Sequence, residues 1–248
     1  MAKTRRETLR WMGTGTAAVA GLSGTASARF GDDEDEDDPA EVRVIHASPD
    51  APAVDVFVGG NPVLEDVPFK TVSDYLELEP GSYDVAVAPA DAGVGSAVID
   101  TEVTVEADTD YTVAATGRLA DIQATVLVDD NDDDFPPLPR VRVVHLSPDA
   151  PAVDVVKDAF FGDLELVEDL EFRGQSEYLD LLPLEYDLSV RPAGGDESVF
   201  DFSADTDVGA TYTAFAVGLL EPPEDADNQA FDVVLAEDVA PLSERFGR

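Results

Sequence analysis

One long internal repeat constrains the fold of this chain more than any other feature of its sequence. Residues 42–56 read VRVIHASPDAPAVDV and residues 141–155 read VRVVHLSPDAPAVDV, so 13 of 15 positions are identical. Weaker similarity continues downstream, for example between Tyr83-Asp84 and Tyr186-Asp187. A period of about 100 residues has the size of a domain and far exceeds the 20–50 residues of solenoid repeats. The repeat therefore predicts two tandem copies of one domain.

Both copies show the residue pattern of β-strands. Val42, Val44 and His46 alternate with Arg43 and Ile45, and similar alternation recurs between clusters rich in Pro, Gly and Asp. Alternation with a period of two, rich in β-branched residues, is typical of strands with one buried face. Roughly seven or eight short strands in about 90 residues are typical of a sandwich. We therefore predict an all-β chain with two tandem antiparallel β-sandwich domains, immunoglobulin-like or transthyretin-like.

One strand start resembles the tyrosine corner of such sandwiches. Residues 78–83 read LEPGSY, and in a tyrosine corner the tyrosine hydroxyl bonds back to the preceding turn. The second copy keeps the tyrosine as Tyr186 but has no glycine at the position of Gly81. We expect the hydroxyl of Tyr83 to bond to its own turn; the second copy matches the pattern only at the tyrosine.

The charge of the chain restricts its partners. Asp and Glu total 54 against 15 Lys and Arg, which gives a formal net charge of -39. Such a surface repels phosphate backbones and anionic lipids, so we expect no nucleic-acid partner. Beyond residue 28 only two lysines stand against nine arginines, a composition that favours adaptation to molar salt. The absence of cysteine excludes disulfides and thiolate chemistry.

The N-terminus has the features of an export signal. Arg5 and Arg6 are followed by a weakly apolar stretch and then by Ala26-Ser27-Ala28, a small-x-small cleavage pattern ending at Ala28. This order resembles a twin-arginine signal peptide, which implies the twin-arginine translocase as a partner during export. The apolar stretch is shorter than the about 20 residues of a membrane-spanning helix, so we expect no span after cleavage. The predicted location is secreted or cell-surface.

These features divide the chain into six segments. The signal peptide covers residues 1–28 and an acidic spacer covers 29–39. The first sandwich covers 40–128, an acidic and proline-rich linker 129–139, the second sandwich 140–238, and a C-terminal tail 239–248. Self-repelling charges and prolines favour an extended linker.

The repeated motif resembles a known family. Both copies contain H-x-S-P-D-A-P-x-V-D-V, from His46 to Val56 and from His145 to Val155, and the first continues into the L-x-P-G-x-Y strand start. This pattern resembles domain-of-unknown-function family 4397, over roughly residues 40–238. The resemblance implies an extracellular, β-rich domain pair that occurs often in tandem. It implies no established reaction, ligand or catalytic residue.

The motif holds the main candidate site residues. They are the two histidines of the chain and the Ser and Asp residues that follow each of them: His46, Ser48, Asp50, Asp55, His145, Ser147, Asp149 and Asp154. A His and an Asp together can serve acid–base chemistry. The same residues can instead order a proline-flanked turn by bonding to local backbone amides. No nucleophile-elbow sequence accompanies them, so we favour the structural role.

Metal binding has weaker support. One His per copy and no Cys give too few soft ligands for zinc. Calcium prefers oxygen ligands, and the two Ala-Asp-Thr-Asp sequences offer Asp108, Asp110, Asp205 and Asp207. The linker imitates the start of an EF-hand loop but has Asp134 where glycine is needed. The sequence therefore predicts no cofactor, with calcium as the open alternative.

Four Asp residues, two of them in the motif, lie within predicted strands. Asp55 and Asp154 follow the alternation of one strand, Asp84 and Asp187 that of another, and we expect all four to face solvent. Arg43 and Arg142 should lie on the face opposite the histidines, available for cross-strand pairing with Asp. The preferred function is a non-catalytic interaction or structural module at the cell surface, with an unknown extracellular or cell-envelope partner. The alternatives are a hydrolase or metal-dependent enzyme using the motif, or a calcium-binding surface protein.

Overall fold

The structure is a computed structural model that describes residues 38–130, 138–157 and 162–245. The described residues form two compact units, one ending at Asp130 and the other beginning after it. Arg5, Arg6, Ala28, nearly all of the acidic spacer and most of the linker lie outside the described residues, so the export signal stays a prediction.

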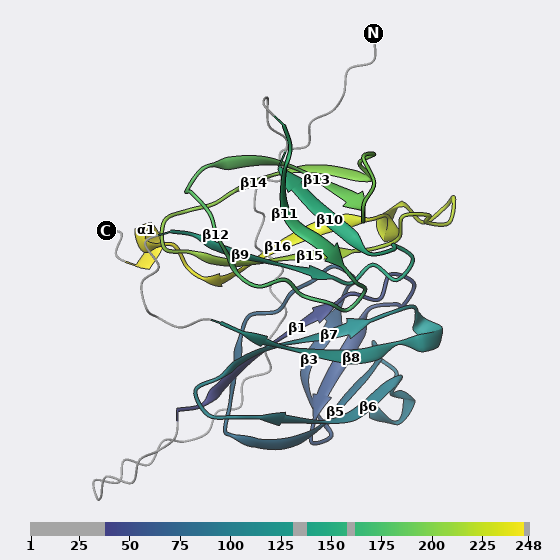
Figure 1. Ribbon diagram of the computed structural model, residues 1–248. Helices are drawn as coiled ribbons and strands as arrows, with labels where there is room; N and C mark the ends of the chain where they lie inside the picture. The colour runs from purple at the N-terminus through teal and green to yellow at the C-terminus, as the bar shows by residue number, and fades with distance from the viewer. Residues whose placement is uncertain (1–37, 131–137, 158–161, 246–248) are drawn as a thin grey trace, which may run out of the picture. The chain divides into compact units, whose positions relative to one another are not determined.

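The first unit is a sandwich of two four-stranded sheets (Figure 1). Its sheets have the orders β4-β1-β7-β8 and β3-β2-β5-β6. Short 3₁₀ turns cover Val94–Ser96 and Leu119–Asp121. The strands are β1 (Ala40–His46), β2 (Val54–Val58), β3 (Asn61–Val67), β4 (Leu76–Leu78), β5 (Gly81–Pro89), β6 (Ile99–Val105), β7 (Asp110–Thr116) and β8 (Gln123–Asp129).

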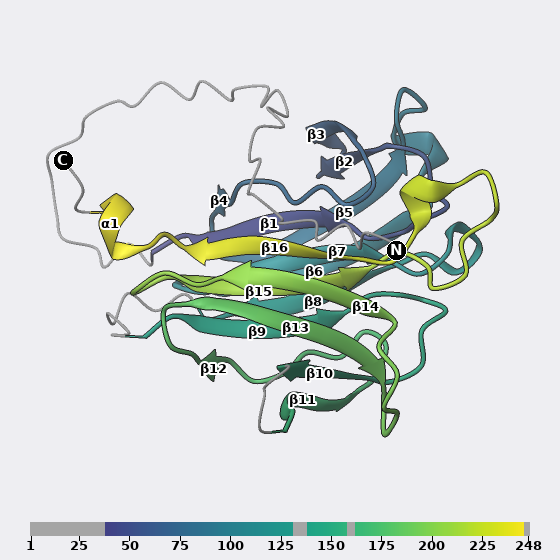
Figure 2. The same ribbon diagram turned by 90° about the horizontal axis from the view of Figure 1, so that it is seen from above.

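The second unit repeats this topology, with sheets β12-β9-β15-β16 and β11-β10-β13-β14 (Figure 2). A 3₁₀ turn covers Asp227–Gln229, and one helical turn, α1 (Leu242–Arg245), follows the last strand. The strands are β9 (Arg140–His145), β10 (Val153–Lys157), β11 (Leu164–Leu170), β12 (Leu179–Asp180), β13 (Glu185–Pro192), β14 (Phe200–Asp205), β15 (Thr211–Val217) and β16 (Asp232–Val239).

The all-β prediction with two sandwiches is confirmed, and one pair of strands in each unit adds a feature that the sequence did not show. β1 and β7 run parallel, with Val44 opposite Val113, and β9 and β15 do the same. The other strand pairs are antiparallel. Residue alternation determines which side chains face the core but carries no information on strand direction. The long connection from β1 to β7 leaves either direction open.

The tyrosine at the start of β5 and its counterpart in β13 each bond to the turn before the strand, as the sequence predicts for Tyr83. The hydroxyl of Tyr83 donates to the Glu79 carbonyl at 2.7 Å, and that of Tyr186 donates to the Leu182 carbonyl at 3.0 Å. Gly81 does not have a positive φ, so its backbone suits other residues. Leu184 can therefore occupy the equivalent position in the second unit.

Small aliphatic side chains from both sheets of each sandwich form its core. The core of the first unit contains Val42, Val44, Val54 and Val56, and that of the second contains their counterparts. Asp129 was assigned to the linker by sequence but is the last residue of β8 and is 4% exposed. In the part of the chain that the structure describes, no helix has the length and apolar character needed to cross a membrane.

Candidate functional site

His46 lies at the end of β1, where the repeated motif begins, and its ring is fully buried. The backbone N–H of Ser48 donates to His46 Nδ1 at 3.4 Å, and His46 Nε2 lies 3.0 Å from the Pro52 carbonyl oxygen. A nitrogen that accepts a hydrogen bond carries no proton, so the proton belongs on Nε2, which donates to Pro52. Both ring nitrogens are therefore used within the motif turn.

His145 repeats this geometry in the second unit. Its Nδ1 accepts from the Ser147 N–H at 3.3 Å, and its Nε2 lies 3.0 Å from the Pro151 carbonyl oxygen. A phenylalanine packs edge-on against each imidazole, at centroid distances of 6.0 Å for Phe69 and 6.1 Å for Phe172. Burial lowers the pKa of both histidines from 6.5, and the hydrogen bonds to the proline carbonyls offset part of this effect. The histidines are therefore neutral in the folded state near pH 7.

The motif aspartates connect each turn to a distant loop. Asp50 Oδ1 accepts the backbone N–H of Leu119 at 2.7 Å. Asp149 accepts two backbone N–H groups, those of Leu220 at 2.9 Å and Glu221 at 3.2 Å. The two loops follow β7 and β15, so each carboxylate fixes the motif turn to the loop after the neighbouring parallel strand of its own sheet. Within the described residues, neither carboxylate is bonded to an imidazole.

The motif serines differ between the copies. Ser147 Oγ donates to the Gly218 carbonyl at 2.7 Å and lies 3.4 Å from Asp149 Oδ1. Ser48 Oγ is buried and has no hydrogen-bond partner within the described part of the chain. In neither copy does the hydroxyl contact the imidazole as a nucleophile would contact its base.

The prediction that Asp55 and Asp154 face solvent is wrong. They are 8% and 7% exposed, because each carboxylate turns inward to bond two loops. Asp55 accepts the N–H groups of Asp66 at 2.8 Å and Asp91 at 3.1 Å. Asp154 accepts those of Asp169 at 2.7 Å and Gly194 at 2.9 Å. The four donors have positive φ, a conformation that turns an N–H away from regular strand pairing. Asp84 and Asp187 are exposed as expected.

The structure contains the cross-strand Arg–Asp pairing expected for Arg43, but sequence analysis missed that it belongs to a buried polar network. Arg43 is 1% exposed, its Nε donates to Thr112 Oγ1 at 2.8 Å, and it lies 3.7 Å from Asp129 Oδ2. The same Asp129 oxygen accepts from Thr112 at 2.6 Å and from Tyr75 at 2.7 Å. The guanidinium also stacks 4.8 Å from the Tyr75 ring centroid. These contacts join β1, β7, β8 and the segment before β4.

The second unit contains the same network. Arg142 Nε donates to Thr213 Oγ1 at 2.9 Å, and Asp238 Oδ2 accepts from Thr213 at 2.6 Å and from Tyr178 at 3.1 Å. Gln175 Oε1 accepts a further bond from Arg142 at 3.0 Å. The repetition of Arg, Thr and Tyr in both copies was a usable signal. Asp129 escaped notice because it borders a run of acidic residues.

The calcium candidates do not gather into a site. Among the described residues no group of three or more His, Asp or Glu side chains could hold a metal ion. The Ala-Asp-Thr-Asp sequences are also not equivalent in space. The Glu106 N–H donates to Tyr111, as the Asp207 N–H donates to Tyr212, so Asp207 corresponds to Glu106 and not to Asp110.

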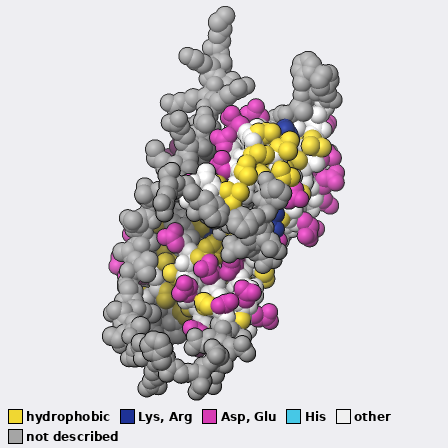
Figure 3. All heavy atoms as spheres, turned by 90° about the vertical axis from the view of Figure 1, so that its left-hand side faces the viewer, with side chains coloured by type: hydrophobic (Ala, Val, Ile, Leu, Met, Phe, Trp, Pro, Cys, Tyr) yellow, Lys and Arg dark blue, Asp and Glu magenta, His cyan; other side chains and the backbone are white. Residues whose placement is uncertain are grey.

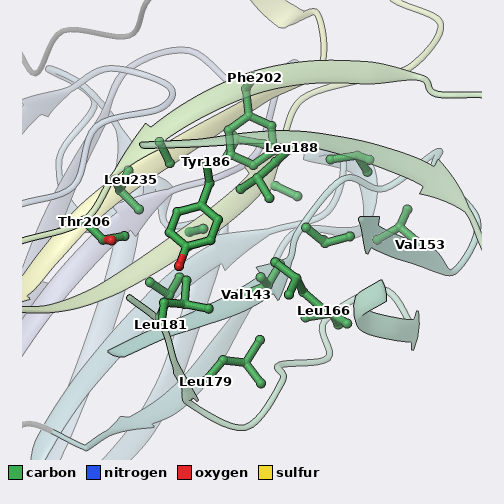
Figure 4. A pocket seen from close by; sticks show the side chains of 18 residues that line it. Val143, Val153, Leu166, Leu179, Leu181, Tyr186, Leu188, Phe202, Thr206 and Leu235 are labelled. Atoms are coloured by element: carbon green, nitrogen blue, oxygen red, sulfur yellow. The ribbon is translucent and has the colours of Figure 1, made fainter. Parts of the chain in front are cut away.

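Each sandwich encloses an apolar cavity between its sheets. Its volume is about 60 Å³ in the first unit and about 40 Å³ in the second. Both are lined mainly by aliphatic side chains, with one tyrosine in each wall, Tyr83 or Tyr186. Figure 4 shows Tyr186, Leu181 and Thr206 together on one side of the second cavity, with Leu166 on the other side of Val143.

The comparison with protein families decides the classification. A family model described as "Domain of unknown function (DUF4397)" matches residues 40–156 and 140–244. The chain belongs to this family. The two sandwiches are thus tandem DUF4397 domains, and the repeated motif and its turn lie inside both matches.

Other comparisons add little to this assignment. No curated protein matches the chain. Among solved structures, the crystal structure of CBMbc (family CBM26) from Eubacterium rectale Amy13K in complex with maltoheptaose is 10% identical. It aligns over 82% of this chain and 99% of that chain, with a TM-score of 0.25. A score this low supports no inference about the fold or the ligand of the DUF4397 domains.

Proposed function

We propose that this tandem DUF4397 protein is an exported, non-catalytic interaction module that works at high ionic strength. One observation carries the non-catalytic part: in both domains the imidazole and the carboxylate of the motif are hydrogen-bonded to backbone groups of their own domain. The motif groups that could act on a substrate are thus engaged in holding a turn.

The geometry argues against acid–base chemistry at the motif. A general base needs a free lone pair within hydrogen-bond reach of a substrate proton. The Nδ1 lone pair of His46 accepts from Ser48, and the His46 side chain is fully buried. The Ser147 hydroxyl donates a hydrogen bond to the backbone carbonyl of Gly218. No cofactor forms part of the proposal.

Replacement of both motif histidines tests the non-catalytic role. In the variant His46→Ala/His145→Ala, the Ser48 and Ser147 amides and two proline carbonyls lose their partners. Each buried unpaired group costs about 1–3 kcal/mol, so the free energy of unfolding should fall in chemical denaturation. An enzyme would instead lose turnover while its stability stayed unchanged. A hydrolytic activity that disappears in the folded, stable variant would contradict the proposal.

The export part has a separate test. Replacing Arg5 and Arg6 by Lys keeps the charge but removes the paired guanidinium groups that define a twin-arginine signal. We expect the precursor of this variant to accumulate inside the cell, while the unaltered chain is cleaved after Ala28 and exported. Unchanged secretion of the variant, detected by N-terminal sequencing of the exported protein, would refute this route.

A further inference from the structure

We call the surface formed by Lys157, Leu164, Leu182 and Leu184 the mouth of the second cavity. These four residues differ from those at the equivalent positions of the first domain. Strand register pairs Lys157 with Leu164, where the first domain pairs Val58 with Asn61. Tyr186 bonds to the Leu182 carbonyl, where Tyr83 bonds to that of Glu79. The second domain therefore carries one lysine and two leucines where the first has Val, Asn and Glu. Leu184 likewise takes the place of Gly81.

The added leucines are exposed around the cavity. Leu164, Leu182 and Leu184 are 56%, 58% and 39% exposed. Leu164 precedes Leu166 by two positions in β11, and Leu166 lines the cavity. The hydroxyl of Thr206, another lining residue, donates to the Leu182 carbonyl at 2.9 Å and accepts the Leu184 N–H at 3.4 Å. Figure 3 shows hydrophobic side chains gathered on one part of the surface in the upper half of the view, surrounded by acidic ones.

Lys157 places a cation at this mouth. Its Nζ lies 4.5 Å from the ring centroid of Tyr186, which lines the cavity. It is one of only two lysines beyond residue 28 in a chain of net charge -39. The nearby Arg191 is paired with Asp163 at 2.8 Å. By contrast, the described residues provide no carboxylate that forms an ion pair with Lys157.

We propose that the second DUF4397 domain binds a single-chain aliphatic carboxylate at this mouth. The end of the alkyl chain enters the cavity, the rest of the chain crosses Leu164, Leu182 and Leu184, and the carboxylate meets the Lys157 ammonium. The size of the cavity selects the ligand: a cavity of about 150 Å³ accepts benzene, so one of about 40 Å³ admits only the end of a slim chain. Molar salt screens the repulsion between the acidic chain and an anion.

This inference names a ligand class for the interaction module proposed above and therefore rests on that function. Exposed apolar side chains gathered on a soluble domain commonly mark a binding site. A membrane surface is a poorer match than a single chain, because the patch has one lysine and the whole chain is strongly acidic. A single amphiphile with one head group matches the one cation and the narrow cavity.

Octanoate below its micelle concentration is the probe, titrated into the full chain in molar salt and followed by calorimetry. We expect saturable binding with one site per chain. The variant Lys157→Val/Leu164→Asn/Leu182→Glu installs the residues of the first domain at exposed or half-buried positions. It should bind at least tenfold more weakly and keep its melting temperature. Val199→Asn replaces another exposed apolar side chain of the same domain and should leave binding unchanged.

Two further variants separate the head group from the tail. Lys157→Met should weaken octanoate binding severalfold and leave octanol binding nearly unchanged. The matched control Lys70→Met alters neither. In strand register, Ala204 and Ala214 occupy the positions that Val103 and Val113 have in the first domain. The variant Ala204→Val/Ala214→Val therefore installs the first domain's valines. The added methyl groups narrow the cavity, so both ligands should bind more weakly.

Three outcomes would overturn the proposal. The first is the absence of saturable octanoate binding by the unaltered chain at millimolar concentration. The second is binding that survives the triple replacement at the mouth. The third is association with phospholipid vesicles but not with octanoate, which would assign the patch to a membrane surface. Each is distinguishable from failure of the proposed function, because the histidine variants report on catalysis without any ligand at this mouth.

Discussion

His46 and His145 give the motif turns a dependence on pH. Each ring accepts a backbone N–H at Nδ1, and a protonated imidazole could only donate there. Burial is the main cause that lowers the pKa of both rings from 6.5, so the folded state favours the neutral form. The unfolded chain takes up these protons first as the pH falls. Their contribution to stability is therefore complete above pH 6.5 and is lost as the pH falls below that value.

We expect the free energy of unfolding at constant molar salt to decrease between pH 7.5 and pH 5. Denaturant unfolding of the unaltered chain and of His46→Gln/His145→Gln measures this decrease. The variant should lose part of the slope, because glutamine does not titrate. The comparison with the variant is needed because other groups also titrate. Burial raises the pKa of Glu237, so its protonation at acidic pH increases the free energy of unfolding, opposite to the effect of the histidines. Identical slopes in the two proteins would contradict the assignment of neutral, structural histidines.

The sequence predicted the turns at His46 and His145 but not the burial of Asp55 and Arg43. A histidine next to Ser-Pro-Asp belongs to a local turn, and local turns are encoded by neighbouring residues. Asp55 instead bonds to amides of Asp66 and Asp91, which lie 11 and 36 positions away. The alternation of residues in β2 predicted which face of the sheet Asp55 lies on. It did not predict that the loops containing Asp66 and Asp91 cover that face. Arg43 is buried for the same kind of reason, by partners from distant strands.

The Arg43 network holds three strands of one sheet together. The Asp129 carboxylate of β8 bonds to Thr112 of β7 and neutralises Arg43 of β1, with both ion-pair side chains at most 1% exposed. Removing one partner of a buried pair leaves the other charge unpaired, at a cost of about 3–5 kcal/mol. We therefore expect Asp129→Ala to lower the free energy of unfolding by an amount of this order. Asp84→Ala, on an exposed face of β5, should have almost no effect.

Denaturant unfolding with two-state analysis checks this expectation, and the variant Asp129→Asn adds a control for shape. Asparagine keeps the side-chain size and one acceptor oxygen but not the charge. It should therefore destabilise the domain less than alanine and more than the Asp84 variant. Equal stability of Asp129→Ala and the unaltered chain would show that the ion pair contributes nothing to the sheet.

Strand existence and strand direction were not equally predictable. Period-two patterns identified β1, β2 and β5, because each has one face in the core. The parallel pairing of β1 with β7 arises from the crossing of the chain between two sheets, which no local pattern encodes. The cavity also escaped sequence analysis. It arises because valine and alanine side chains from both sheets do not fill the gap of about 10 Å between sheets.

The acidic excess belongs to the whole molecule. At a net charge of -39 the folded chain repels itself, and at molar salt the Debye length falls to about 3 Å and this repulsion is screened. We expect the β-sheet signal in circular dichroism and the melting temperature to fall as salt is removed by dialysis. Replacing sodium chloride by an equal ionic strength of another monovalent salt should preserve the fold. A melting temperature independent of salt would contradict adaptation to high ionic strength.

The two DUF4397 domains should each fold without the other. Each has its own two sheets, its own buried Arg–Thr–Asp network and its own motif turn, and each inter-sheet core cluster is built from residues of a single domain. The first fragment should run from residue 38 to residue 131, because Asp38 accepts the Asp108 N–H and Asp129 closes β8. The second should begin at Pro139, whose carbonyl accepts the Leu181 N–H, and end at residue 248. In molar salt both fragments should show a cooperative thermal transition and a β-sheet spectrum. If either one is unfolded under these conditions, its core depends on the rest of the chain, and the description as two independent modules is wrong.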